Sequence, residues 1–133
     1  MLVTASKSLR LAFIAPCTEA TGNLTTANRV CGLLEDLGHK CILLDCEKLQ
    51  EGFDSSMLSG IDVCFVLHAY RSGRLLFHEG HLILNPSTAL VLIFGGTDVN
   101  VMTHDEGKMR VMTNVVQRAC RCVCFGDSMV KVA

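Results

Sequence analysis

The chain has 133 residues, of which 50% are hydrophobic and 19% charged, and this composition is typical of one globular domain. Its formal net charge is −1, and only 5% of its residues are aromatic. Nucleic-acid-binding modules carry a basic surface and often stack bases on aromatic rings, so the composition excludes such a module. The longest unbroken apolar run, residues 89–94, has six residues. A membrane-spanning helix needs about 20.

Short apolar segments are the strongest structural signal in the sequence. Segments of this length, bounded by polar or turn-forming residues, are typical of buried strands in parallel sheets. They lie at residues 9–15, 41–44, 61–67, 89–94 and 121–125. The polar stretch between the second and third segments is weakly periodic and predicts only a short helix or a loop.

A helix is expected over residues 24–37, where apolar side chains recur at helical spacing. Thr25 or Thr26 would cap its N-terminus, and Gly38 is well placed to end it. Its core-facing positions would be Ala27, Val30, Cys31, Leu34 and Leu37.

Two further helices are expected in the second half of the chain. One covers residues 74–84 and stops at an Asn-Pro pair, since the residue before a proline disfavours helix. The other opens at residues 103–106, which have the form of a capping box, and runs to Cys120. The core stripe of this last helix would be Met109, Met112, Val116 and Ala119.

These elements predict an α/β fold in a single domain, residues 1–133. Short apolar strands that alternate with helices form a Rossmann-like, doubly wound parallel sheet with right-handed crossovers. We expect about five strands in the order 3-2-1-4-5. Residues 126–133 follow the last strand, where a covering helix would be usual, so we interpret the domain as truncated at this end. The resulting exposed edge would favour self-association.

The eight cysteines are interpreted as free thiols. A chain this long and this apolar does not need disulfides to fold, and most of the cysteines lie within apolar segments. Cys120, Cys122 and Cys124 alternate on one strand and would be buried small hydrophobes, so no metal site is expected. We therefore expect a cytoplasmic protein. The alternative is a secreted one, if the apolar run at residues 11–15 belongs to a signal segment.

Polar, glycine-containing loops follow three of the expected strands, at residues 16–23, 68–73 and 95–100. Ligands of doubly wound sheets bind outside the carboxyl ends of the strands, so these loops are expected to converge on one site. The first loop also leads into a helix N-terminus, whose free N–H groups suit a phosphate or carboxylate.

Residues 21–27 (TGNLTTA), 67–73 (LHAYRSG) and 94–100 (FGGTDVN) resemble motifs in the acceptor-side half of group 1 (family 4) glycosyltransferases. The resemblance implies a GT-B architecture, in which two Rossmann-like domains face each other across a cleft, and this chain would be the N-terminal half. Its partners would be a sugar or glycan acceptor and a nucleotide-sugar co-substrate, with no other cofactor.

The donor-binding half of that family usually carries a Glu-x7-Glu pair, which is absent from this sequence. The resemblance therefore implies the acceptor-side domain of an enzyme that transfers a sugar from a nucleotide-sugar donor. We expect this domain to be inactive alone, because the donor site would belong to the other half.

Five residues in the first two loops would bind substrate or phosphate if the resemblance holds residue by residue. Gly22 would let the backbone approach a ligand closely, and Asn23 would donate a hydrogen bond. His68, Arg71 and Ser72 would follow the third strand into the cleft, where the guanidinium would pair with phosphate or carboxylate.

The loop after the fourth strand supplies the remaining candidates. Gly96 and Thr97 would contact substrate. Asp98 is the candidate catalytic residue, because its carboxylate could bind sugar hydroxyls or assist proton transfer. Many members of the family place a histidine near this turn, where this chain has Gly-Gly-Thr-Asp.

Two other functions stay open at this point. The chain could be a non-catalytic binding or interaction domain that pairs with other chains. It could also be a dinucleotide- or flavin-binding redox module, because Asp45 ends the second strand, where such folds place the acid that binds the ribose. Against the second alternative, Gly22 lacks the other two glycines of the G-x-G-x-x-G fingerprint.

Overall fold

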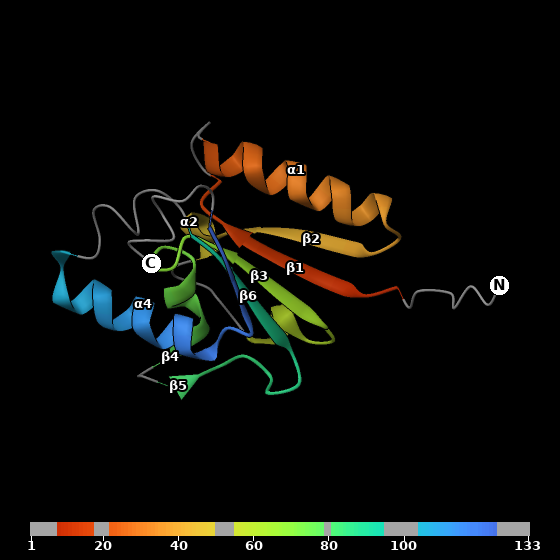
Figure 1. Cartoon of the computed structure of the whole chain (residues 1–133). Helices are drawn as coiled ribbons and strands as arrows, with labels where there is room; N and C mark the ends of the chain where they lie inside the picture. Colours follow the sequence, from red (N-terminus) through yellow and green to blue (C-terminus); the bar gives the residue numbers. More distant parts are fainter. Residues whose placement is uncertain (1–7, 18–21, 50–54, 79–80, 95–103, 125–133) are drawn as a thin grey trace.

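The computed structural model describes residues 8–17, 22–49, 55–78, 81–94 and 104–124 (Figure 1). The strands (β), α-helices (α) and 3-10 turns (η) follow one another in the order β1 (Arg10–Ala15), α1 (Gly22–Asp36), β2 (Lys40–Asp45), α2 (Cys46–Leu49), η1 (Ser55–Leu58), β3 (Val63–Leu67), η2 (Gly73–Leu76), β4 (Phe77–His78), β5 (His81–Leu82), β6 (Ala89–Ile93), α4 (Glu106–Arg118) and β7 (Arg121–Val123).

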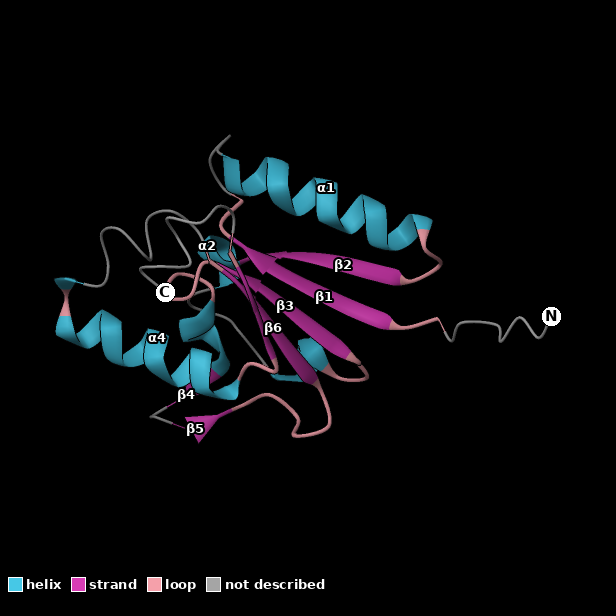
Figure 2. Ribbon diagram, in the orientation of Figure 1, coloured by secondary structure: helices cyan, strands magenta, loops and turns pink. Residues whose placement is uncertain are grey.

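The strands confirm the expected α/β fold, with one five-stranded parallel sheet in the order β2-β1-β3-β6-β7 (Figure 2). Counted along the chain this order is 2-1-3-4-5, so the expected order 3-2-1-4-5 is wrong. β3 pairs directly with β1, placing Phe65 opposite Phe13, and β2 becomes an edge strand. The burial of the strands agrees with these positions, because every residue of β2 is at least partly exposed whereas β3 has three buried residues, Cys64, Val66 and Leu67.

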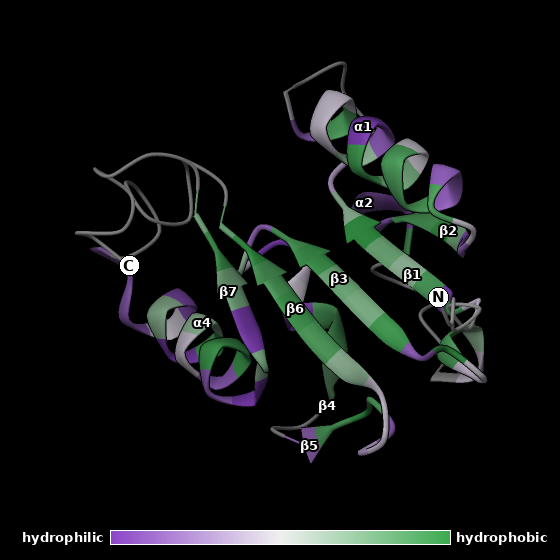
Figure 3. Ribbon diagram, turned by 45° about the vertical axis from the view of Figure 1, so that its right-hand side comes forward, coloured by the Kyte–Doolittle hydropathy of each residue, from purple (hydrophilic) through white to green (hydrophobic). Residues whose placement is uncertain are grey.

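Helices cover the sheet on both faces, as a doubly wound fold requires (Figures 1 and 2). α1 lies along one face, where Ala27 and Cys31 pack in a cluster with Phe13. α4 packs on the other face, where Met112 and Val115 join the larger core cluster. Figure 3 shows that β1, β3 and β6 are hydrophobic along most of their length, which follows from their burial between these two layers.

α1 begins two residues earlier than expected and ends one residue earlier, at Asp36, with Gly38 just beyond it as expected. It starts at Gly22, so Thr25 and Thr26 lie inside the helix and the interpretation of either as the N-cap is wrong. Gly38 ends it in a left-handed conformation with φ +96°, which a glycine adopts without strain. Leu37 lies beyond the helix and is 70% exposed, so it does not belong to the core stripe.

α4 also differs from the prediction, both in the residue that caps it and in the side chains that it buries. Asp105 is its N-cap, with a side-chain oxygen that accepts a hydrogen bond from the Lys108 amide at 3.0 Å. The buried positions are Met112 and Val115, whereas Met109 and Val116 of the expected stripe are exposed. Among the described residues, no helix is both long and apolar enough to cross a membrane.

The prediction of a helix over residues 74–84 is wrong. The apolar residues of this segment instead form the single turn η2 and the two-stranded antiparallel pair β4–β5. Close packing against α4 accompanies this arrangement: a Cβ atom on Gly73 would lie 2.6 Å from Cγ2 of Val115. A glycine fits there without a shift of Val115. The short apolar groups that follow, residues 75–77 and 82–84, are compatible with a strand pair as well as with a helix.

β7 is the last strand of the sheet within the described residues, next to β6. Cys120 and Cys122 are exposed and Cys124 is half-buried, so the expectation that all three are buried is wrong. Val123 on the same strand is also exposed. Burial of these side chains would need a layer beyond the one that α4 provides within the described residues.

Candidate functional site

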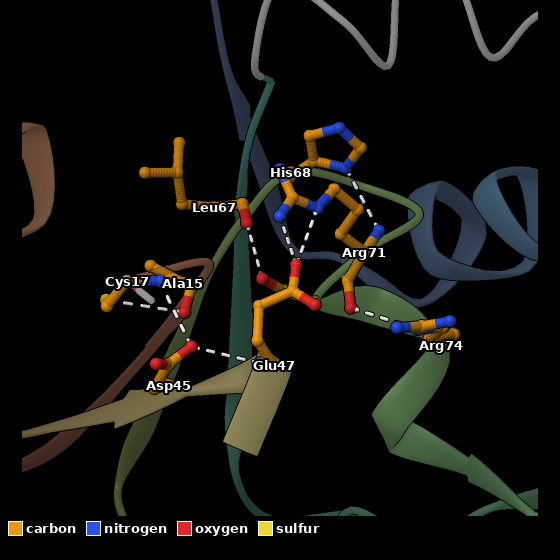
Figure 4. A network of polar contacts seen from close by, with 9 residues as sticks. Ala15, Cys17, Asp45, Glu47, Leu67, His68, Arg71 and Arg74 are labelled. Carbon is orange, nitrogen blue, oxygen red and sulfur yellow. Dashed lines mark hydrogen bonds and ion pairs between the residues drawn. The ribbon is translucent and has the colours of Figure 1, made fainter. Parts of the chain in front are cut away.

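The candidate site lies where β1, β2 and β3 end. From β1 the chain crosses to β2 on one side and, after β2, to β3 on the other, so the crossover direction changes beside β1. Doubly wound folds bind ligands at such a switch point, outside the carboxyl ends of the strands. Residues that follow all three strands meet there in one network of polar contacts (Figure 4).

Arg71 and Glu47 are the charged pair of this network. Nε of Arg71 donates to Oε1 of Glu47 at 2.8 Å, and Nη2 of the same guanidinium forms an ion pair with the same oxygen. The two side chains keep 34% and 25% of their surface exposed, so the pair lies at the surface rather than in the core. The arginine proposed from the sequence as an anion ligand is therefore already engaged by a carboxylate.

Glu47 is the residue that sequence reasoning missed. It belongs to the four-residue helix α2, which follows β2 directly. Its position in the sequence could have identified it, because Glu47 lies two residues beyond the end of β2. Polar residues at such positions lie near the carboxyl ends of the strands, where ligands of doubly wound sheets bind.

His68 directly follows β3 and is fully buried. Its Nδ1 accepts a hydrogen bond from the Arg71 amide at 2.9 Å, which leaves the proton of a neutral ring on Nε2. Burial, and then the charges of Arg71 and Arg74, lower the pKa of His68 to about 4, so the ring is neutral near pH 7.

Two features of His68 lower the stability of the folded state. Its backbone has φ +80°, the left-handed region that few residues other than glycine adopt. Its Nε2 is buried and has no hydrogen-bond partner among the described residues. A strained residue with an unpaired buried donor is the kind of feature that concentrates at functional sites.

Ser72 closes the turn that carries Arg71. Its hydroxyl is buried and donates to the Leu67 carbonyl at 2.6 Å, and its amide donates to the His68 carbonyl at 3.2 Å. The hydroxyl therefore holds the turn after β3 in place.

Asp45 connects the ends of β1 and β2. Its Oδ1 accepts from the Cys17 amide at 3.1 Å and from the Glu47 amide at 3.0 Å (Figure 4). Burial, and then the neighbouring Asp45 carboxylate, raise the pKa of Cys17 to about 11, so this thiol stays protonated near pH 7. The carboxylate expected to bind a ribose in the dinucleotide alternative thus connects Cys17, just after β1, to α2.

Gly22 and Asn23 open the first turn of α1, Gly22 exposed and Asn23 half-buried. The positive end of the helix dipole therefore lies at their end of the helix, and no acidic side chain in the first turn offsets it. Within the described part of the chain, a Cβ on Gly22 would meet no atom within 4 Å, so its backbone is open to close approach from that side.

Gly96, Thr97 and Asp98 lie outside the described residues. An open hollow lies at the other end of the sheet, lined by residues of η1 and of the segment before β6. None of the described site residues lines it. No three His, Cys, Asp or Glu side chains among the described residues are grouped so that they could hold a metal ion.

The comparisons with known proteins bear out the resemblance drawn from the three motifs. No protein-family profile matches the chain. The chain is 34% identical over 127 residues to glycosyltransferase 1 domain-containing protein 1 of Xenopus tropicalis. The match covers 94% of this chain and 35% of that protein. The chain is therefore similar, over nearly all of its sequence, to about a third of a protein named for a glycosyltransferase domain.

Proposed function

We propose that the chain is the acceptor-side domain of a glycosyltransferase that uses a nucleotide-sugar donor, and that it transfers no sugar by itself. The observation that carries the proposal is the group of His68, Arg71 and Glu47 at the switch point of the sheet. The similarity to a protein named for a glycosyltransferase domain supports it.

The residues at this edge can bind an anionic sugar ligand. Arg71 offers a planar guanidinium that matches phosphate or carboxylate oxygens, once Glu47 releases it. Glu47 would then accept hydrogen bonds from sugar hydroxyls. The Nε2 proton of His68 is a further donor, unpaired among the described residues. Ser72 acts through the turn, because its hydroxyl holds that turn to β3.

The other candidates complete the proposed site. Gly22 and Asn23 would meet a phosphate with backbone amides and the α1 dipole. Gly96 and Thr97 would contact the substrate, and Asp98 would assist proton transfer. In a GT-B enzyme the leaving diphosphate is stabilised by the second domain, which closes the cleft and excludes water. We therefore expect the isolated chain to bind substrate fragments without turnover.

Thermal unfolding of the purified chain tests this function against a redox module. The probes are glucose 1-phosphate, UDP-glucose, NAD and FMN, each added in excess, since a ligand of the native state raises Tm. We expect the sugar phosphates to raise Tm and NAD and FMN to leave it unchanged. Stabilisation by NAD or FMN without any effect of the sugar phosphates would overturn the proposal. Release of UDP from UDP-glucose by the chain alone would overturn the second part of the proposal, that the chain transfers no sugar by itself.

A second candidate function, an interaction domain, is favoured by β7. This edge strand exposes Cys122 and Val123. An exposed strand edge with apolar side chains favours pairing with another chain. We propose self-association through this edge, which is compatible with the first function and is tested separately below. We also propose that the protein is cytoplasmic, with its cysteines reduced.

A further inference from the structure

Cys31 and Cys41 form the closest contact between thiols in the described part of the chain. Their sulfur atoms lie 3.1 Å apart and share a hydrogen bond, and neither cysteine is in a disulfide. The sulfurs of a disulfide lie about 2.05 Å apart, so a bond between the two would need a displacement of only about 1 Å.

The fold itself brings these sulfurs together. Cys31 lies on the inner side of α1 with 7% of its surface exposed, and Cys41 lies on β2, which follows α1 after the turn at Gly38. Both side chains pack in the same apolar cluster between α1 and the sheet. The pair is thus held by the packing of a helix on its neighbouring strand rather than by two mobile loops.

The other cysteines are placed differently. Cys46 and Cys64 are completely buried, and the three cysteines at β7 lie at the far edge of the sheet. Cys17 is the one other cysteine that could form a disulfide with Cys31. It packs against the same cluster, and a negative charge on it would raise the pKa of Cys31. Among the described cysteines, only Cys31 and Cys41 share a sulfur–sulfur hydrogen bond.

We propose that Cys31 and Cys41 are a redox modification site, at which a low-molecular-weight disulfide such as oxidised glutathione produces an intramolecular disulfide. The thiolate of Cys41 attacks one sulfur of the oxidant, whose S–S bond breaks and releases one glutathione thiolate. Cys31, after losing its proton, attacks Sγ of Cys41 in the mixed disulfide and expels the second glutathione. Two protein thiols lose two electrons and two protons, and the oxidant gains them as two molecules of reduced glutathione.

The order of these steps follows from exposure. Cys41 is half-buried and Cys31 is buried, so the oxidant reaches Cys41 first. Burial, and then its hydrogen bond to Cys41, raise the pKa of Cys31 to about 12. Burial also raises the pKa of Cys41, but its hydrogen bond to Cys31 acts in the opposite direction. The reaction is therefore slow near pH 7 and accelerates as the pH rises, because the thiolate is the nucleophile.

The disulfide would fasten α1 to β2. It closes a short loop through Gly38 and restricts the unfolded chain, which stabilises the fold. We expect the Tm of the oxidised protein to rise by about 10 °C. Because Gly22 and Asn23 open the same helix, the bond also fixes the element that carries them.

Mass spectrometry of the whole chain tests the proposal. A variant with Cys120→Ser, Cys122→Ser and Cys124→Ser removes the three thiols at β7, two of them exposed, that could link two molecules. After incubation with excess oxidised glutathione, free thiols are alkylated under denaturing conditions and the protein is digested with trypsin. We expect a linked pair of peptides, residues 30–40 and 41–48, with the mass of two hydrogens lost. Fragment spectra should place the link at Cys41 rather than at Cys46.

Two single substitutions in that background serve as controls. Cys31→Ser should accumulate glutathione on Cys41, because no second thiol resolves the mixed disulfide. Cys41→Ser should leave Cys31 unmodified, and neither variant should show the rise in Tm. In the same experiment, glutathione on Cys122 of the unsubstituted chain shows that the oxidant is active. Full alkylation of Cys31 and Cys41 under those conditions, or a link from Cys31 to Cys17, would overturn the proposal.

Discussion

The ion pair between Arg71 and Glu47 spans the end of β1. Glu47 follows β2 and Arg71 follows β3, and these two strands flank β1 in the sheet. The contact, 2.8 Å from Nε to Oε1, therefore lies across the switch point from which the loop toward α1 departs. A ligand that binds Arg71 there must compete with a carboxylate that belongs to the protein.

His68 makes the stability of the fold depend on pH. Its pKa is lowered to about 4 by burial and by Arg71 and Arg74, whereas in the unfolded chain it has its ordinary value near 6.5. The unfolded state therefore binds more protons between these values, and stability falls as the pH drops from about 6.5 to 4. The loss attributable to His68 is up to about 3 kcal/mol.

Urea unfolding at pH 7 and at pH 4.5 measures this effect. His68→Asn is the variant of choice, because asparagine tolerates a positive φ and does not titrate. Its free energy of unfolding should change less between the two pH values than that of the unsubstituted chain. The same pH dependence in both proteins would show that His68 is not the titrating group.

Gly73 and Gly32 give opposite outcomes for the same substitution. Gly73→Ala would place a Cβ 2.6 Å from Cγ2 of Val115, and we expect a loss of about 1–3 kcal/mol of stability. Gly32→Ala on α1 meets no atom within 4 Å, and alanine favours the helix by about 1 kcal/mol. Denaturant unfolding of both variants checks this, and a neutral Gly73→Ala would contradict the tight packing of η2 on α4.

Self-association through β7 is tested with a matched pair of lysine substitutions. Val123→Lys puts a charge on the exposed edge strand, and we expect it to reduce the apparent mass in light scattering after gel filtration. Leu37→Lys, at a position that is 70% exposed beyond the end of α1, should leave the mass unchanged. A monomeric unsubstituted chain, or an equal effect of both substitutions, would argue against this edge.

The five strands of the parallel sheet were predictable from the sequence because each lies in a short apolar run, and the end of α1 because Gly38 adopts a left-handed conformation. The short pair β4–β5 was not predictable, because its residues were expected in a helix. The strand order was not predictable from the sequence. β2 and β3 have similar apolar patterns, and which of them takes an inner position beside β1 depends on what covers each face of the sheet. The region after Gly73 was misjudged for a related reason, because its contact with Val115 is invisible in the local pattern.

The candidate site was predictable in part. The rule that ligands bind at carboxyl ends of strands identified the turn with His68 and Arg71. It could not show that Ser72 is used within that turn, that the His68 backbone has a positive φ, or that Glu47 pairs with Arg71. The Arg71–Glu47 pair joins residues 24 positions apart, which meet only when the sheet forms. The His68 backbone has a geometry that its residue type disfavours, and the Ser72 contact depends on the turn that this geometry creates.

The affinity of the chain for glucose 1-phosphate, measured by calorimetric titration, tests the central claim most directly. Arg71→Ala should weaken binding by about 1.5–3 kcal/mol, the contribution of a charge-assisted hydrogen bond. Glu47→Gln should strengthen it, because the guanidinium no longer pairs with a carboxylate. Arg110→Ala, at an exposed position of α4, is the control for loss of a positive charge and should have little effect. Equal affinity of the unsubstituted chain, Arg71→Ala and Glu47→Gln would contradict an anion site at Arg71.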